Sequence, residues 1–136
     1  MKYVLDTNAV SALMKGTAAV IERLAATAPA DVALPQPALA EIAFGIERLP
    51  RSRRRAALQS RFNLISAELP RAEWTDAVSQ MFGRIKATLE RRGTRIEDFD
   101  AAIAAHALVL DATLVTANVD HRIRVPGLRV ENWSQS

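Results

Sequence analysis

The sequence contains no cysteine and few aromatic residues. The absence of cysteine excludes disulfide bonds, zinc sites with thiolate ligands and cysteine nucleophiles, and it suits a reducing cytoplasm. Because only 5% of the residues are aromatic, alanine and leucine must fill most of the core, which favours helices. There is no run of roughly 18 or more apolar residues, so we expect no membrane-spanning helix. The apolar part of the N-terminus is too short for a signal peptide.

Neither sign of charge dominates the sequence, which has 18 basic and 15 acidic residues and a net charge of +3. Its arginines nevertheless fall into three groups: Arg51, Arg53, Arg54, Arg55 and Arg61; Arg91, Arg92 and Arg95; and Arg122, Arg124 and Arg129. Clustered arginine suits a polyanionic partner. A solvated helix surface explains any single cluster better, so a polyanion-binding role needs support from the acidic residues.

A chain of 136 residues, 49% of them apolar, has the size of one domain, and no repeat or linker divides residues 1–136. Short apolar segments are expected to form strands: Lys2–Leu5, Val32–Leu34, Leu64–Ile65, Thr113–Thr116 and Leu128–Val130. Apolar residues at helical spacing predict helices: residues 9–15, 18–28, 36–49, 71–92 and 99–110. Ser52 can cap a further helix that starts there. Strands alternating with helices predict an α/β fold with a parallel sheet and helices on both faces.

Two acidic residues, Asp98 and Asp100, precede the most apolar of these helices. From Ala101 to Leu110 the only polar side chain is that of His106. A helix that is apolar nearly all round is buried. An unpaired charge at the N-terminus of such a helix costs free energy. An N-cap, the helix dipole or a metal ion would explain an acid there. The two aspartates lie about 200° apart on a helical wheel, so only one is expected to face a shared site.

Other polar residues follow the expected strands. Asp6 comes directly after the first strand, and Asn118 and Asp120 come after a later one. Ligands of parallel sheets bind beyond the carboxyl ends of the strands, so topology predicts that these side chains converge. Glu41, on the third helix, lies off the apolar face, between small residues that leave room for a ligand.

The candidate site residues all carry side-chain oxygen: Asp6, Glu41, Asp98, Asp100, Asn118 and Asp120. Oxygen ligands without histidine or cysteine indicate a hard cation, Mg²⁺ or Mn²⁺. Several carboxylates brought together cannot all stay ionised unless a divalent cation neutralises them. Such an ion binds phosphate oxygens and lowers the pKa of a bound water.

Each candidate also has a purely structural interpretation. A helix cap explains Asp6 as well as a catalytic role does, and a solvated helix position explains Glu41 better. Asn118 and Asp120 are residues that favour turns. The remaining residues that stand out are expected in the core: His106, Trp74 and Phe82.

Four motifs, in this order and spacing, resemble the signature of PIN-domain proteins: Asp6-Thr7-Asn8 after an apolar strand, Ala40-Glu41, Asp98-Phe99-Asp100-Ala101-Ala102-Ile103-Ala104-Ala105, and Leu114-Val115-Thr116-Ala117-Asn118. Over essentially its whole length the chain is similar to the VapC-type toxins of bacterial toxin–antitoxin pairs, including the FitB-like branch. The resemblance implies a three-layer α/β/α fold with a short, mostly parallel central sheet. It also implies a homodimer and a Mg²⁺-dependent cytoplasmic endoribonuclease, with Mn²⁺ as a substitute, inhibited by a cognate VapB-like antitoxin.

The resemblance assigns site roles by position. The family's first three acids correspond to Asp6, Glu41 and Asp100, and its fourth position corresponds to Asn118. By this correspondence Asp6 and Asp100 bind Mg²⁺. Glu41 shares the ion or positions a water, and Asn118 completes the ring of polar side chains around the ion.

The chain departs from the family pattern near its C-terminal end. A further Asp of the family, followed by Phe, would fall on His121, and Asp120 is a candidate substitute after a shift of one residue. Asp98 becomes either the helix cap or an auxiliary acid. The departure leaves the second metal position open.

A non-catalytic PIN-like module that binds RNA or protein is the alternative function. The asparagine at position 118 and the missing Asp-Phe pair favour it. The three retained acids oppose it, because a binder gains nothing from a repulsive acidic cluster near RNA. A phosphoryl-transfer receiver domain would need adjacent acids in the first strand–helix loop and a lysine after a late strand, and neither occurs.

Overall fold

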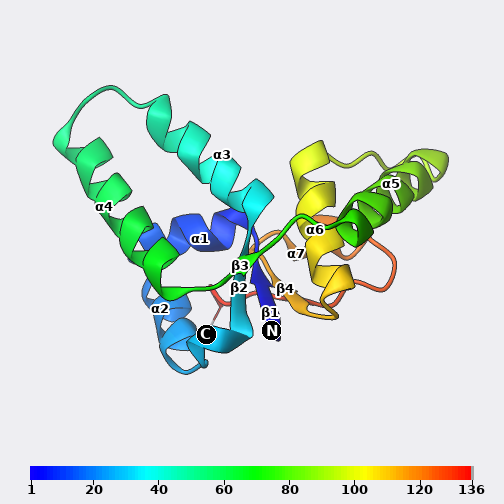
Figure 1. The fold of residues 1–136 in the computed structure, drawn as a ribbon, viewed down its shortest axis with the longest axis horizontal. Coiled ribbons are helices and arrows are strands. Elements are labelled where there is room, and N and C mark those ends of the chain that lie inside the picture. Colours follow the sequence, from blue (N-terminus) through cyan, green and yellow to red (C-terminus); the bar gives the residue numbers. More distant parts are fainter. Residues whose placement is uncertain (136) are drawn as a thin grey trace.

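The computed structural model describes residues 1–135, which contain a five-stranded sheet of order β3-β2-β1-β4-β5. All four neighbouring strand pairs are parallel. The strands are β1 (Tyr3–Leu5), β2 (Val32–Pro35), β3 (Arg71–Ala72), β4 (Thr113–Val115) and β5 (Val130–Glu131). Figure 1 shows them in the middle of the molecule, surrounded by helices. The predicted α/β fold with a parallel sheet is confirmed.

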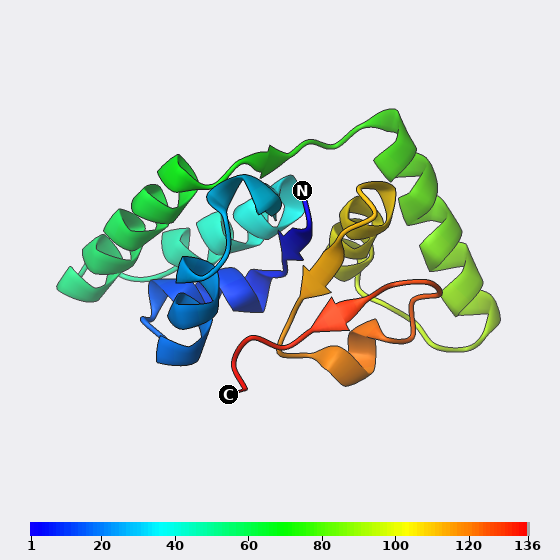
Figure 2. The ribbon, with the colours of Figure 1, turned by 90° about the horizontal axis from the view of Figure 1, so that it is seen from below.

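The helices are α1 (Thr7–Met14), α2 (Ala18–Ala25), α3 (Gln36–Glu47), α4 (Arg53–Glu68), α5 (Asp76–Arg91), α6 (Asp98–Val109) and α7 (Val119–Arg122), with a 3-10 turn, η1, at Pro29–Asp31. Figure 2 shows α1 to α4 on one side of the strands and α5 with α6 on the other. In Figure 1, α3 and α4 extend as one arm, and α5 and α6 form a second.

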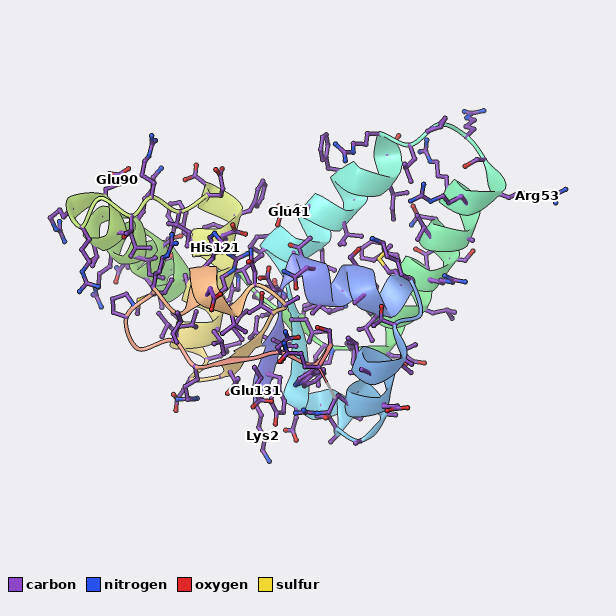
Figure 3. The ribbon with its side chains drawn as sticks, turned by 180° about the vertical axis from the view of Figure 1, so that it is seen from behind. Lys2, Glu41, Arg53, Glu90, His121 and Glu131 are labelled. Atoms are coloured by element: carbon purple, nitrogen blue, oxygen red, sulfur yellow. The ribbon has the colours of Figure 1, made fainter. Side chains whose placement is uncertain are left out.

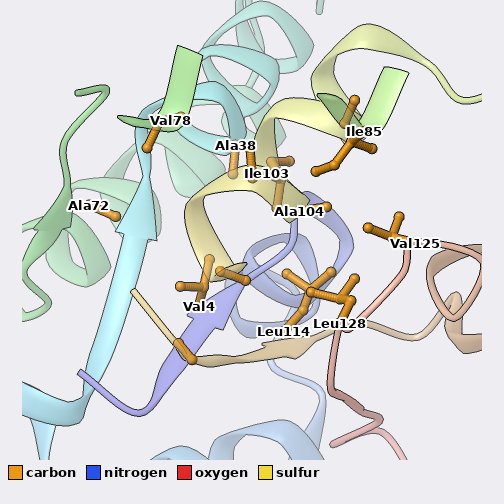
Figure 4. Close-up of a cluster of buried hydrophobic side chains, with 14 of the residues drawn as sticks. Val4, Ala38, Ala72, Val78, Ile85, Ile103, Ala104, Leu114, Val125 and Leu128 are labelled. Carbon is orange, nitrogen blue, oxygen red and sulfur yellow. The ribbon is translucent and has the colours of Figure 1, made fainter. Parts of the chain in front are cut away.

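Strand residues alternate between two buried clusters, one on each face of the sheet. Val4 and Leu114 belong to the cluster that includes α5 and α6, whereas Leu5 and Val115 belong to the cluster that includes α1. Successive side chains of a strand point to opposite faces, so helices cover both faces in three layers. Figure 4 shows the first cluster, with Ile103 of α6 among its members.

Helix α6 is the most deeply buried helix. Residues 101–107 are all buried, and most are alanines, whose small side chains let α6 pack closely against α5. His106 is fully buried, and its Nδ1 lies 2.7 Å from the carbonyl oxygen of Ala102. His106 is therefore the core histidine that we expected.

One expected strand is wrong and another is displaced. Leu64–Ile65 lie within α4, which follows Ser52; the Ser52 hydroxyl accepts a hydrogen bond from the backbone N–H of Arg55 (3.1 Å). A capped helix satisfies its own backbone groups, which leaves no strand in this segment. The last strand begins at Val130 rather than at Leu128.

The helix expected at residues 71–92 begins only at Asp76. Arg71–Ala72 instead pair with β2, and the Thr75 hydroxyl caps α5 by accepting from the backbone N–H of Val78 (3.3 Å). Trp74 therefore precedes the helix and is 45% exposed, so its expected place in the core was wrong. The other expected helices agree with the structure to within one turn at each end. Among the helices of residues 1–135, none combines the length and apolar character needed to span a membrane.

Candidate active site

Asp6 lies at the carboxyl end of β1 and caps α1. Its backbone N–H donates to the carbonyl oxygen of Val115 in β4 (2.9 Å), and its Oδ1 accepts from the backbone N–H of Thr7 (2.7 Å). Only 1% of Asp6 is exposed. Asp6 is thus both a helix cap and a buried carboxylate whose second oxygen is left for another partner.

Glu41 and Asp100 approach Asp6 from two other elements. Glu41, on α3, is partly buried, and its Oε1 accepts from the Thr7 hydroxyl (2.5 Å). Burial raises the pKa of Asp100, in the first turn of α6. Arg122 opposes that rise, and the charges of Asp6 and Glu41 add to it. The structure therefore brings together the three acids implied by the resemblance.

Arg122, which we had placed in a surface cluster, is buried between the two aspartates. Its Nε donates to Asp6 Oδ2 and its Nη2 donates to Asp100 Oδ1, both at 3.0 Å. Arg122 is 6% exposed and ends the short helix α7. One feature of the sequence could have indicated its role. By the family resemblance, Arg122 stands where the Phe of the family's Asp-Phe pair is expected. We call Asp6, Glu41, Asp100 and Arg122 the acidic centre.

The other candidate residues lie outside the acidic centre. Asp98 is the first residue of α6 rather than its cap; its side chain is 67% exposed and pairs with Lys86 Nζ at 2.8 Å. Asn118 is exposed, and its Oδ1 lies 3.0 Å from His121 Nδ1. Asp120 is exposed too, and within residues 1–135 no hydrogen bond or ion pair joins its side chain to another residue. Neither Asp98 nor Asp120 belongs to this group of acids.

Asn8, to which sequence reasoning gave no separate role, ties α1 to the loop after β4. Its Oδ1 accepts from the backbone N–H of Ala117 (3.0 Å), and its Nδ2 donates to the Thr116 hydroxyl (3.3 Å). That loop leads into α7. Thr7 thus holds the acid of α3, and Asn8 holds the segment that carries Arg122.

Two cavities meet at the acidic centre, and Glu41, Asp100 and Arg122 line both. One, of about 840 Å³, extends toward α5 and α6; the other, of about 460 Å³, extends between α1, α3 and α4. Basic side chains line both: Lys86, Arg95 and Arg124 in the larger, and Lys15, Arg48 and Arg54 in the smaller. Figure 3 shows Glu41 and His121 near the middle of the molecule, between the arms.

The donor set of the acidic centre suits a hard cation, although a guanidinium now bridges it. Carboxylate oxygens are the ligands that Mg²⁺ prefers. As the side chains stand, no three acidic or histidine groups in residues 1–135 are arranged to hold an ion. The chemistry of Asp6, Glu41 and Asp100 therefore fits Mg²⁺, and Arg122 bridges two of these three acids.

Comparison with known proteins gives the same family as the motifs. Residues 3–125 match the PIN domain family. The chain is 31% identical over 137 residues to Ribonuclease VapC2 of Rickettsia felis, covering 99% of this chain and 100% of that protein. It is 28% identical to the tRNA(fMet)-specific endonuclease VapC of Shigella flexneri, covering 98% of this chain and 99% of that protein.

Solved structures are similar over the same length. The crystal structure of VapBC2 from Rickettsia felis bound to a promoter DNA fragment matches with a TM-score of 0.85 and 28% identity, covering 98% of this chain and 99% of that one. DNA-bound VapBC from Salmonella typhimurium matches with a TM-score of 0.86 and 28% identity, covering 98% of each chain. The expected PIN-like fold and family are confirmed. The chain therefore belongs to the PIN-domain family, and within it to the VapC ribonuclease toxins of toxin–antitoxin pairs.

Proposed function

We propose that this chain is a Mg²⁺-dependent endoribonuclease whose ion binds at the acidic centre. The observation that carries the proposal is the convergence of three carboxylates, from the end of β1, from α3 and from α6, where two cavities meet. Asp6 is almost fully buried, and a buried carboxylate beside others needs a cation. A site of this kind suits the handling of a phosphate group.

In this proposal Asp6 and Asp100 hold the ion. Glu41, oriented by the Thr7 hydroxyl, shares the ion or positions the attacking water. When bound, Mg²⁺ polarises the scissile phosphate and lowers the pKa of a water, and Mn²⁺ can replace it because it prefers the same oxygen ligands. In-line attack on phosphorus breaks the bond to the 3′ oxygen and leaves a 3′-hydroxyl and a 5′-phosphate. Asn118 completes the ring only once its contact with His121 breaks.

The two cavities offer a path for the RNA backbone through the acidic centre. Both carry arginine and lysine side chains on either side of the three acids. Such contacts position the phosphates without reading sequence. Two relatives of this chain are named as tRNA(fMet)-specific endonucleases, which makes that tRNA the first substrate to offer.

A cognate VapB-like antitoxin, a homodimer and a cytoplasmic location complete the proposal. The matched structures are VapBC complexes. Phe44 on α3 and Leu64 on α4 are 64% and 65% exposed. Large exposed apolar side chains on one arm are typical of a surface that binds a protein. We assign this arm to the antitoxin.

A second candidate function is a PIN-like module that binds RNA or protein without cutting RNA. The Arg122 bridge favours it, because a guanidinium already neutralises Asp6 and Asp100. The two functions differ in whether a divalent ion reaches those carboxylates and in whether RNA is cut.

The test is cleavage of a labelled tRNA by the purified protein with Mg²⁺, with EDTA, and with the variants Asp6→Asn and Asp100→Asn. We expect cleavage only with Mg²⁺ and a loss of more than about 100-fold in each variant, because each removes an ion ligand. Asp111→Asn is the matched control, since Asp111 also pairs with an arginine, Arg129, but lies on the surface away from both cavities.

The control variant should keep the wild-type rate. Full activity of Asp6→Asn and Asp100→Asn, or equal cleavage in EDTA, would contradict the proposed metal site. Binding of RNA without cleavage, across tRNAs and with the metal present, would favour the non-catalytic module.

A further inference from the structure

Arg122 differs from the other arginines and lysines that form ion pairs in residues 1–135. Its side chain is 7% exposed and that of Asp6 is 1% exposed, whereas the cations of the other ion pairs are 26% to 74% exposed. Guanidinium stays protonated at every physiological pH. A permanent positive charge therefore sits in the one place where the proposed reaction needs a divalent ion.

Both side-chain oxygens of Asp6 already accept a hydrogen bond. Oδ1 accepts from the backbone N–H of Thr7 (2.7 Å), and Oδ2 accepts from Arg122 Nε (3.0 Å). The Asp100 Oδ1 atom is likewise taken by Arg122 Nη2 (3.0 Å). The cap contact with Thr7 belongs to the helix start and stays with the fold. The guanidinium is thus the partner that must leave Asp6.

An ion at Asp6 and Asp100 would compete with this guanidinium. Mg²⁺ binds oxygen at about 2.0–2.1 Å, so an ion on Asp6 Oδ2 and Asp100 Oδ1 would lie close to the Arg122 nitrogens, which are 3.0 Å from the same two oxygens. Two positive groups in contact would also repel each other strongly in a site of low dielectric. Binding of one therefore requires departure of the other.

We propose that Arg122 competes with the divalent ion for the acidic centre. Its guanidinium occupies the site until the ion displaces it. This inference rests on the proposed function and adds a regulation of the same site. The chain then binds its ion more weakly than the same acids would without Arg122. When the ion is absent, the Arg122 guanidinium neutralises Asp6 and Asp100 and keeps both side chains in place.

The surroundings of Arg122 give the side chain room to move. It lines both cavities, of about 840 and 460 Å³. It ends a helix of four residues, and the next residue, Ile123, is 63% exposed. A rotation of the side chain into either cavity is enough to free Asp6 Oδ2, and the sheet and α6 need not move.

The test compares the binding of Mn²⁺ by calorimetry in the wild type, Arg122→Met and Arg129→Met. Methionine keeps an apolar stem and removes the charge. Arg129 is the matched control, because it pairs with Asp111 at the same 3.0 Å but on the surface. We expect Arg122→Met to bind Mn²⁺ roughly 10-fold or more tightly than the wild type, and Arg129→Met to bind it equally. Equal affinities in all three proteins would overturn the inference.

A second measurement needs no variant and covers the case in which Arg122→Met does not fold. In the wild type, the Nε–H group of Arg122 donates to the buried Asp6, so its proton should give a protected NMR signal. Saturating Mg²⁺ should move that signal and expose the proton to solvent exchange. A signal that stays in place and protected, while Mg²⁺ binds, would overturn the displacement.

Cleavage of RNA by the same preparations separates this inference from the proposed function. Tighter Mn²⁺ binding by Arg122→Met with no cleavage by either protein supports the competition and contradicts the nuclease. Mg²⁺-dependent cleavage by both proteins with equal ion affinities supports the nuclease and contradicts the competition. Failure of both proteins to bind Mn²⁺ overturns the competition.

Discussion

The acidic centre and the surface pair of Arg129 with Asp111 contain the same two chemical groups in different surroundings. In both, an arginine donates to an aspartate oxygen at 3.0 Å. The side chains of Arg122 and Asp6 are 7% and 1% exposed, and those of Arg129 and Asp111 are 56% and 89% exposed. The two ion pairs therefore have the same nitrogen–oxygen distance but differ greatly in solvent screening.

That difference decides what each pair contributes. An exposed ion pair adds little because water and salt screen it and both side chains lose freedom. In a buried pair, removal of one partner leaves an unpaired charge in a medium that solvates it poorly. The acidic centre carries a third acid as well, so the loss of its cation exposes several like charges to one another.

The largest expected effect is that of Arg122→Met on stability without divalent ions. We expect the free energy of unfolding in EDTA to fall by about 3 kcal/mol, the typical cost of removing one partner of a buried pair. Urea denaturation of the wild type and the variant measures it, with Arg129→Met as control. A loss no larger than that of the control would mean that water screens the acidic centre as it screens the surface.

A smaller effect is expected from Thr7→Val, which removes the hydroxyl that donates to Glu41 (2.5 Å). We expect a loss of about 1 kcal/mol in stability, typical of one hydrogen bond, and slower RNA cleavage because Glu41 is no longer oriented. The matched control is Thr27→Val, whose hydroxyl donates to the carbonyl oxygen of Arg23 on the surface (2.7 Å). If both variants cut RNA at the wild-type rate, Thr7 does not position Glu41.

The pH dependence of stability should report the burial of Asp100. Burial raises the pKa of Asp100 above 3.8, so between 3.8 and the raised pKa the folded protein binds more protons than the unfolded chain. Its contribution to stability is therefore present below pH 3.8 and lost as the pH rises through the raised pKa. The side chain of the Asp100→Asn variant cannot ionise. In EDTA, the free energy of unfolding of this variant should therefore rise relative to that of the wild type as the pH rises over this range.

Urea denaturation of Asp100→Asn and the wild type at a series of pH values measures this difference. Parallel profiles for the two proteins would contradict the effect of burial on Asp100.

Sequence reasoning predicted the parts of the molecule that depend on periodicity and topology. The parallel sheet followed from short strands between helices. The meeting of Asp6 with Asp100 was implied by the family resemblance, whereas Asn118 and Asp120, which the topology predicted to converge with Asp6, lie outside the acidic centre. Gly93 follows the end of α5 with a φ of +72°, which glycine adopts without strain. The start of α5 was missed, because the apolar spacing continues through Trp74 although Thr75 caps the helix.

The central role of Arg122 could not be predicted from its own neighbourhood in the sequence. It stands with Arg124 and Arg129, and all three looked alike as possible phosphate contacts. In the structure they separate: Arg122 enters the acidic centre, Arg124 lines the larger cavity, and Arg129 pairs with Asp111. Spacing along a loop does not determine which side chain is buried, because that depends on contacts with residues more than a hundred positions away, such as Asp6.

The smallest expected effect is that of Arg129→Met, and its response to salt makes the comparison sharper. We expect the variant to lose less than about 0.5 kcal/mol at low salt, and this loss should disappear in about 0.5 M NaCl because the pair is exposed. The loss in Arg122→Met should persist at the same salt concentration, since salt screens a buried ion pair much less than an exposed one. A salt-dependent loss of equal size in both variants would show that burial does not separate the two pairs.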